Sequence, residues 1–190
     1  MRQSADVELV RGKPEILPIK GKFHIEHLRA GEVVGDYDVP NTITTEGKLF
    51  LLDVMFHGTA AITTWYVGLV DNTGYSAFAT GDTYDNINQP GNGWDEFTTY
   101  TVSANATIRA TWDEGAAYGA GNITSSTTAV FDITANGTVK GIFVCGGANA
   151  QTKSDDTATG NKLWSAAPFS SGNVTVLNAD QLKVTYTVSC

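Results

Sequence analysis

The chain has 190 residues and a formal net charge of −8. Such a charge argues against general nucleic-acid binding and against docking on anionic membranes, because both surfaces carry negative charge. We find no stretch near the ~20 apolar residues of a membrane helix and no apolar signal-peptide core at the N-terminus, so we expect synthesis in a cytosol. Charged residues make up only 17% and glycines number 20, which is typical of many short strands joined by tight turns.

Residues 1–20 form a predicted extended arm, because they contain Pro14 and Pro18 and show little periodicity. Residues 1–22 carry five basic and three acidic side chains (+2), whereas the remainder carries seven and seventeen (−10). This asymmetry predicts either an arm that docks on an acidic neighbour or a disordered terminus. The candidate interaction residues are Arg2, Arg11, Lys13, Ile16, Leu17, Ile19 and Lys20. Residues 21–190 are expected to form a single domain.

One helix is predicted, over residues 45–56. Thr45 can cap its start, and Gly58 can end it in the left-handed conformation. An apolar stripe follows the helical period along one face. This stripe consists of Leu49, Leu52 and Phe56, widened by Leu51 and Met55.

Most of the chain has the period-two pattern of strands. The predicted strands cover 22–29, 32–38, 62–71, 106–112, 127–134, 138–145 and 181–189. Ala30-Gly31 predicts a hairpin between the first two strands, and Ala135-Asn136-Gly137 is the strongest hairpin signal in the chain. In 106–112 the alternation places Trp112 on the inner face and Arg109 on the outer face. Strands of this spacing predict an all-β fold, an antiparallel β-sandwich or jelly roll.

Two regions are irregular. Residues 72–93 are rich in glycine and contain Tyr75, Phe78 and Tyr84, which predicts a long loop held by its own aromatic side chains. Residues 146–161 are polar and almost free of large apolar side chains, which predicts an exposed, mobile tip.

No motif predicts catalysis, a cofactor or a metal site. His24 and Glu26 give the H-x-E element of zinc deaminases, but the P-C-x-x-C element is missing, and His27 should point to the opposite face of its strand. We interpret Cys145 and Cys190 as free thiols.

Acidic side chains in turns could include the two carboxylates of a glycosidase, but the sequence singles out no particular pair. They are Asp82, Asp85, Asp95, Glu96, Asp113 and Glu114.

Tryptophans offer an alternative, because aromatic side chains can line a sugar-binding platform. Trp65 and Trp112 lie on the apolar faces of their predicted strands, which favours core packing for these two. For Trp94 and Trp164 the sequence does not decide between core packing and sugar binding.

A resemblance covers residues 42–189. The helix EGKLFLLDVMF is followed by TTWYVGLVD, GYSAFATGDTYDN and GWDEFTTY, and the chain closes with KLWSAAPF and DQLKVTYTVS. This order of segments resembles small structural proteins of tailed-bacteriophage heads, the decoration or cement proteins. The resemblance implies a rigid β body without reaction chemistry, assembled in the bacterial host cytoplasm and carried in the virion.

The expected function is therefore that of a non-enzymatic capsid decoration or cement protein that stabilises subunit junctions of a phage head. Its expected partners are the major capsid protein and copies of itself, without direct contact to nucleic acid or membrane. The alternative is a glycan-binding or other tail or baseplate module of the particle, and a phage depolymerase is a third possibility.

Overall fold

The computed structural model describes residues 18–75, 77–87, 93–117, 119, 121–155, 157 and 159–190. It confirms an all-β fold with one short α-helix. The elements are β1 (Lys20–Arg29), β2 (Glu32–Ile43), α1 (Thr45–Phe56), β3 (Trp65–Asp71), the 3₁₀ helix η1 (Tyr84–Asn86), β4 (Glu96–Phe97), β5 (Tyr100–Thr101), β6 (Ala110–Trp112), β7 (Asn122–Thr124), β8 (Ala129–Ile133), β9 (Gly137–Gly146), β10 (Lys162–Pro168), β11 (Val174–Val176) and β12 (Gln181–Ser189).

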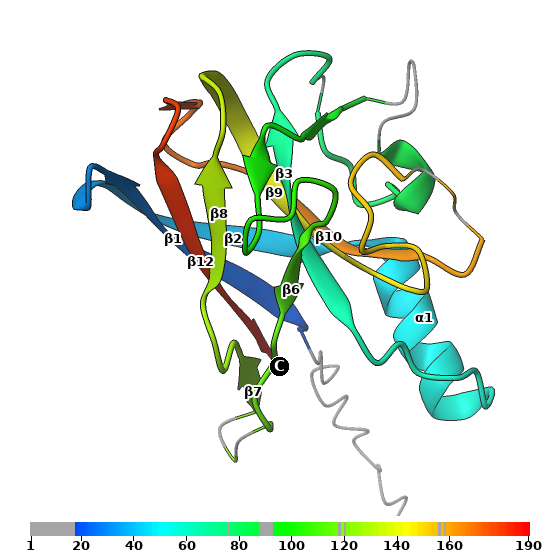
Figure 1. Cartoon of the computed structure of the whole chain (residues 1–190). Helices are drawn as coiled ribbons and strands as arrows, with labels where there is room; N and C mark the ends of the chain where they lie inside the picture. Colours follow the sequence, from blue (N-terminus) through cyan, green and yellow to red (C-terminus); the bar gives the residue numbers. More distant parts are fainter. Residues whose placement is uncertain are drawn as a thin grey trace, which may run out of the picture.

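The strands of the described residues form one antiparallel sheet that nearly closes into a barrel (Figure 1). The order is β4-β3-β9-β10-β2-β1-β12-β8-β5, while β11 pairs with β9, β6 with β3 and β7 with β12. The two ends of this path, β4 and β5, are joined by only Thr98 and Thr99 in the sequence. This short connection holds the two ends of the sheet together.

Two apolar clusters stabilise the body. The larger one fills the inside of the curved sheet and includes Phe23, Val67, Phe131 and Tyr186. The smaller one lies on the other face of β3 and β9, where loop residues such as Trp94 pack against Phe143. Strands β3 and β9 are therefore buried on both faces, which fits the near-continuous apolar sequence of each.

The β1–β2 hairpin is confirmed. Ala30 and Gly31 both have positive φ values, of 51° and 85°, as expected for a two-residue turn whose twist matches that of the strands. β1 also pairs with β12 along its whole length, from Lys20 opposite Ser189 to Leu28 opposite Gln181.

The hairpin predicted at Ala135-Asn136-Gly137 is wrong. β8 pairs with β12 and β5, whereas β9 pairs with β3, β10 and β11. The turn sequence forms a corner at which the chain crosses from one part of the sheet to another. Turn residues fix the local backbone, but they do not decide which strand is the hydrogen-bonding partner.

The helix has the predicted bounds, but its cap is Thr44 rather than Thr45. The Thr44 side chain accepts a hydrogen bond from the Gly47 amide at 3.0 Å. Gly58 has a φ of 69°, so it ends the helix as predicted. Gly47 is buried against Trp164, where a β-carbon would lie 2.9 Å from the Trp164 ring and carbonyl. A glycine there lets the helix approach β10 closely.

Most described side chains of the segment 146–161 are exposed, as its polarity predicts, but the segment also sends side chains into the body. Ala150, Lys153 and Asn161 are buried, and the Lys153 ammonium donates to the carbonyls of Thr98 and Tyr100 at 2.7 and 2.6 Å. Polar side chains here fold inward because they satisfy buried backbone groups of the neighbouring loop. The aromatic residues of the 72–93 region do pack together as predicted, with Tyr75 edge-on to Phe78 and Phe78 edge-on to Trp94.

Candidate functional site

An apolar groove of about 440 Å³ lies between helix α1 and one end of the barrel. This is the end where the chain enters β1 and leaves β12 (Figure 1). The groove is lined by Ile19, Phe50, Leu51, Val54, Ala61, Ile62, Trp65, Trp112, Glu114, Ala117, Gly121, Asn122, Ile123, Trp164, Val188, Ser189 and Cys190. Its size lies within the range of ligand pockets, roughly 300–1,000 Å³, and its surface suits aliphatic or aromatic groups.

Three of the four tryptophans line this groove. Trp65 and Trp164 are half-buried and meet edge to face, with ring centroids 5.9 Å apart. The Trp164 indole N–H donates to the Tyr186 hydroxyl at 3.1 Å. The Trp112 indole N–H is buried and has no acceptor among the described residues. Trp94, for which the sequence did not decide between core packing and sugar binding, is buried in the smaller core.

The outer face of α1 forms a second apolar surface. Leu49, Leu52, Met55 and Phe56 are between 51% and 76% exposed. They are four of the five residues of the predicted stripe, and the fifth, Leu51, is half-buried and lines the groove. The helix therefore docks on the body through the side opposite to most of the stripe. We call these four side chains the α1 apolar face. Large apolar side chains grouped on a surface are typical of protein–protein contact sites.

The helix is anchored firmly beneath this face. The Glu46 carboxylate accepts hydrogen bonds from the backbone amides of Tyr84 and Leu163, at 2.9 and 2.8 Å. It also pairs with Lys162 at 3.2 Å. Because Glu46 is tied to the η1 loop and to β10, the α1 apolar face is held in one position on the body.

Most residues of the predicted interaction arm lie outside the described residues. These are Arg2, Arg11, Lys13, Ile16 and Leu17. Ile19 lines the apolar groove, and Lys20 begins β1, where it pairs with Ser189 and Thr42. The sequence analysis named Ile19 as a candidate interaction residue, but the sequence contained no signal for the groove, which is assembled from parts of the chain that lie far apart in the sequence.

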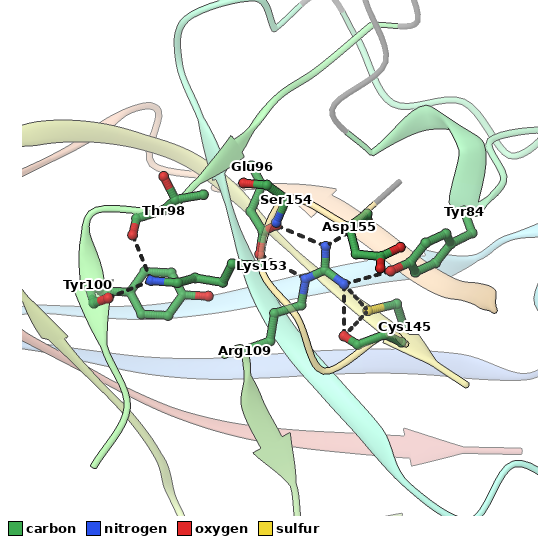
Figure 2. A network of polar contacts seen from close by, with 10 residues as sticks. Tyr84, Glu96, Thr98, Tyr100, Arg109, Cys145, Lys153, Ser154 and Asp155 are labelled. Atoms are coloured by element: carbon green, nitrogen blue, oxygen red, sulfur yellow. Dashed lines mark hydrogen bonds and ion pairs between the residues drawn. The ribbon is translucent and has the colours of Figure 1, made fainter. Parts of the chain in front are cut away.

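A buried polar cluster surrounds Arg109 (Figure 2). Its guanidinium donates to both carboxylate oxygens of Glu96 at 2.8 and 2.9 Å, to the Tyr84 hydroxyl at 2.8 Å and to the Ala150 carbonyl at 2.8 Å. Neither side chain of the Arg109–Glu96 pair is exposed. Arg109 lies on the sheet face opposite to Ala110 and Trp112, as strand alternation predicts, but loops cover that face, so its side chain is buried.

The Arg109 cluster acts as a structural clamp. Its members come from η1, β4, β9, the segment 146–161 and Arg109, which directly precedes β6, so it ties the covering loops to the barrel wall. Glu96 also accepts a hydrogen bond from the Ser154 amide at 2.8 Å. The neighbouring Cys145 thiol is fully buried, and burial raises its pKa to about 12. The thiol is thus held in its neutral form at ordinary pH.

The three histidines lie apart from one another. His24 faces Asp36 and Asp38 on the surface, at 3.5 and 3.2 Å, while His27 points inward to Asp180 at 2.8 Å. These opposite orientations agree with the strand geometry expected for residues 24 and 27. The described part of the chain holds no group of three or more histidine, cysteine or acidic side chains placed to bind a metal ion.

Both cysteines are free, as predicted, with Cys145 buried and Cys190 exposed at the groove. Within the described residues, no helix has the length and apolar character to cross a membrane. No protein-family model, curated protein or solved structure matches this chain.

Proposed function

We propose that this chain is a non-enzymatic structural protein of a tailed-phage particle, a decoration or cement protein that stabilises subunit junctions of the head. Its partners are the major capsid protein and other copies of itself. The proposal rests on the resemblance of segments 42–189 to such proteins. Within the structure, the α1 apolar face is the observation that supports it best.

The α1 apolar face suits permanent contact with another protein. Burying one large apolar side chain stabilises a contact by roughly 1.5–3 kcal/mol, and Met55 and Phe56 are the most exposed of the four. The helix is already ordered on the body by Glu46 and Gly47. Little conformational entropy is therefore lost on binding, and repetition on a symmetric lattice multiplies even a small interface through avidity.

The alternative, a glycan-binding tail or baseplate module, draws less support from the geometry. Sugar recognition needs exposed aromatic faces combined with polar groups that hydrogen-bond hydroxyls. Trp94 is buried, and the Trp164 indole N–H is already used by Tyr186. The groove at Trp65 and Trp112 is almost wholly apolar in its lining.

Copy number separates these two functions. Particles produced from the genome that encodes this chain would be purified, and the ratio of this chain to the major capsid protein measured by quantitative mass spectrometry. A cement protein is expected at the same order of magnitude as the capsid protein. A ratio typical of tail proteins would favour the alternative, and absence from the particle would overturn both.

The α1 apolar face is tested by the double substitution Met55→Ser and Phe56→Ser. Because both side chains are exposed, the melting temperature should stay nearly unchanged, while affinity for the capsid should fall by at least about ten-fold. The matched control is Val33→Ser with Val34→Ser, two exposed apolar residues at the β1–β2 hairpin tip, away from α1 (Figure 1). Equal capsid binding by the α1 variant and the wild type would contradict a role for this face.

A further inference from the structure

The apolar groove between α1 and the barrel is open at the point where the described chain begins. Ile19 lines it, and the seventeen residues before Pro18 lie outside the described residues. Ile16 and Leu17 are the nearest of these residues with large apolar side chains. Chain geometry keeps the Cα atoms of Ile16 and Ile19 within about 11 Å of each other.

We infer that the groove is the receptor for the chain's own N-terminal segment, and that it takes the side chains of Ile16 and Leu17 from the same copy. The chemistry matches, because the groove presents Phe50, Val54, Ile62 and three tryptophans to two aliphatic side chains. A groove of about 440 Å³ has room for both. This inference concerns the isolated chain and does not depend on the proposed function.

One polar feature of the groove fits a basic peptide segment. Glu114 adds an exposed acidic group to the groove lining, opposite in charge to Lys13 and Arg11 of the segment.

Tethering favours the same copy over a second one. Leu17 is two residues from Ile19, so its effective concentration at its own groove is on the order of millimolar or higher. A second copy would have to reach comparable concentration in solution to compete.

Cys190 provides a direct test, because it is a free, exposed thiol in the groove lining. Ile16→Cys or Leu17→Cys would be made in the full chain and oxidised with glutathione disulfide, which accepts the two electrons as the thiols form a bond. If the segment occupies the groove, an intramolecular disulfide to Cys190 should form at least about ten-fold faster than in Leu9→Cys. The buried Cys145 does not compete.

The gel pattern decides the outcome. Cross-linked monomers from positions 16 and 17 support the inference. Cross-linking no faster than from position 9 overturns it, and so does a predominance of cross-linked dimers, which would place the segment on a second copy. A second measurement needs no cross-link: Ile16→Ser with Leu17→Ser should expose Trp65 and Trp164 and shift tryptophan emission to the red. Val7→Ser with Leu9→Ser is the control, and equal spectra for both variants would contradict occupation by residues 16 and 17.

Discussion

At the scale of single residues, Arg109 has the clearest structural role. A buried charge is costly unless it is paired and hydrogen-bonded, and this guanidinium is satisfied by Glu96, Tyr84 and the Ala150 carbonyl. The cost of burying the pair is offset by the attraction between the two charges and by these hydrogen bonds, which also hold the loops packed on β3 and β9 in place. A complete polar cluster of this kind specifies one arrangement of those loops.

Breaking one side of this pair should therefore destabilise the protein strongly. Glu96→Gln leaves the Arg109 charge buried without its counterion, and we expect a loss of about 3–5 kcal/mol in the free energy of unfolding. Urea unfolding followed by tryptophan fluorescence measures it. The combined variant Glu96→Leu with Arg109→Met should lose less than Glu96→Gln alone, because it removes both charges. A double variant less stable than Glu96→Gln would show that the ion pair itself is the main source of stability.

At the scale of elements, the start of β12 is tied to β1 by Asp180. Its buried carboxylate accepts hydrogen bonds from Nε and Nη2 of Arg29 at 2.9 and 2.8 Å, from His27 at 2.8 Å and from the Leu177 amide at 2.8 Å. The hydrogen bonds from Arg29 above all hold the pKa of Asp180 well below its ordinary value. This contact closes the end of the β1–β12 ladder opposite the apolar groove.

Asp180→Asn should lower the free energy of unfolding by about 2–3 kcal/mol at pH 7. Because the folded-state pKa of Asp180 is depressed, its contribution is fully present above the unfolded-state pKa of about 3.9 and is lost as the pH falls through the folded-state value. The difference between wild type and variant should thus be constant from pH 7 to about 5 and shrink below pH 4. Thermal unfolding over this pH series measures it. A difference that does not shrink in acid would contradict a charge-based contact.

At the scale of the whole molecule, the sheet is nearly closed, and the outer face of β3 and β9 is covered by loops. Cys145 reports on this cover, because its thiol is fully buried beside Arg109 and the Ala150 carbonyl. Burial raises its pKa to about 12, so the reactive thiolate is scarce as well as shielded. Cys190, by contrast, is exposed.

A chromogenic thiol reagent at pH 8 should therefore label one thiol per chain at once and the second only slowly. If the body and its cover unfold together, the slow rate should follow the denaturant dependence of global unfolding. Mass spectrometry of labelled peptides assigns the two phases to Cys190 and Cys145. Labelling of Cys145 that is fast and independent of denaturant would show that segment 146–161 opens locally, as its sequence alone suggested.

The sequence by itself determined the features of the fold that depend only on residues close together along the chain. Periodicity located the helix and most of the long strands, Ala30-Gly31 defined the first hairpin, and Gly58 marked the helix end. These features were predictable because backbone conformation and side-chain alternation are local properties. The all-β class followed from their number and spacing.

Only the tertiary structure decided features that depend on packing between distant segments. The Ala135-Asn136-Gly137 turn joins strands that do not pair, and the α1 stripe faces solvent because the helix docks through Gly47 and Phe50. Distant loops cover the sheet face on which Arg109 lies, so that its charge is buried. In each case the local pattern leaves open which other segment, if any, packs against a given strand or face. The choice between them is made by the free energy of burying one surface rather than the other, and that surface is contributed by residues far away in the sequence.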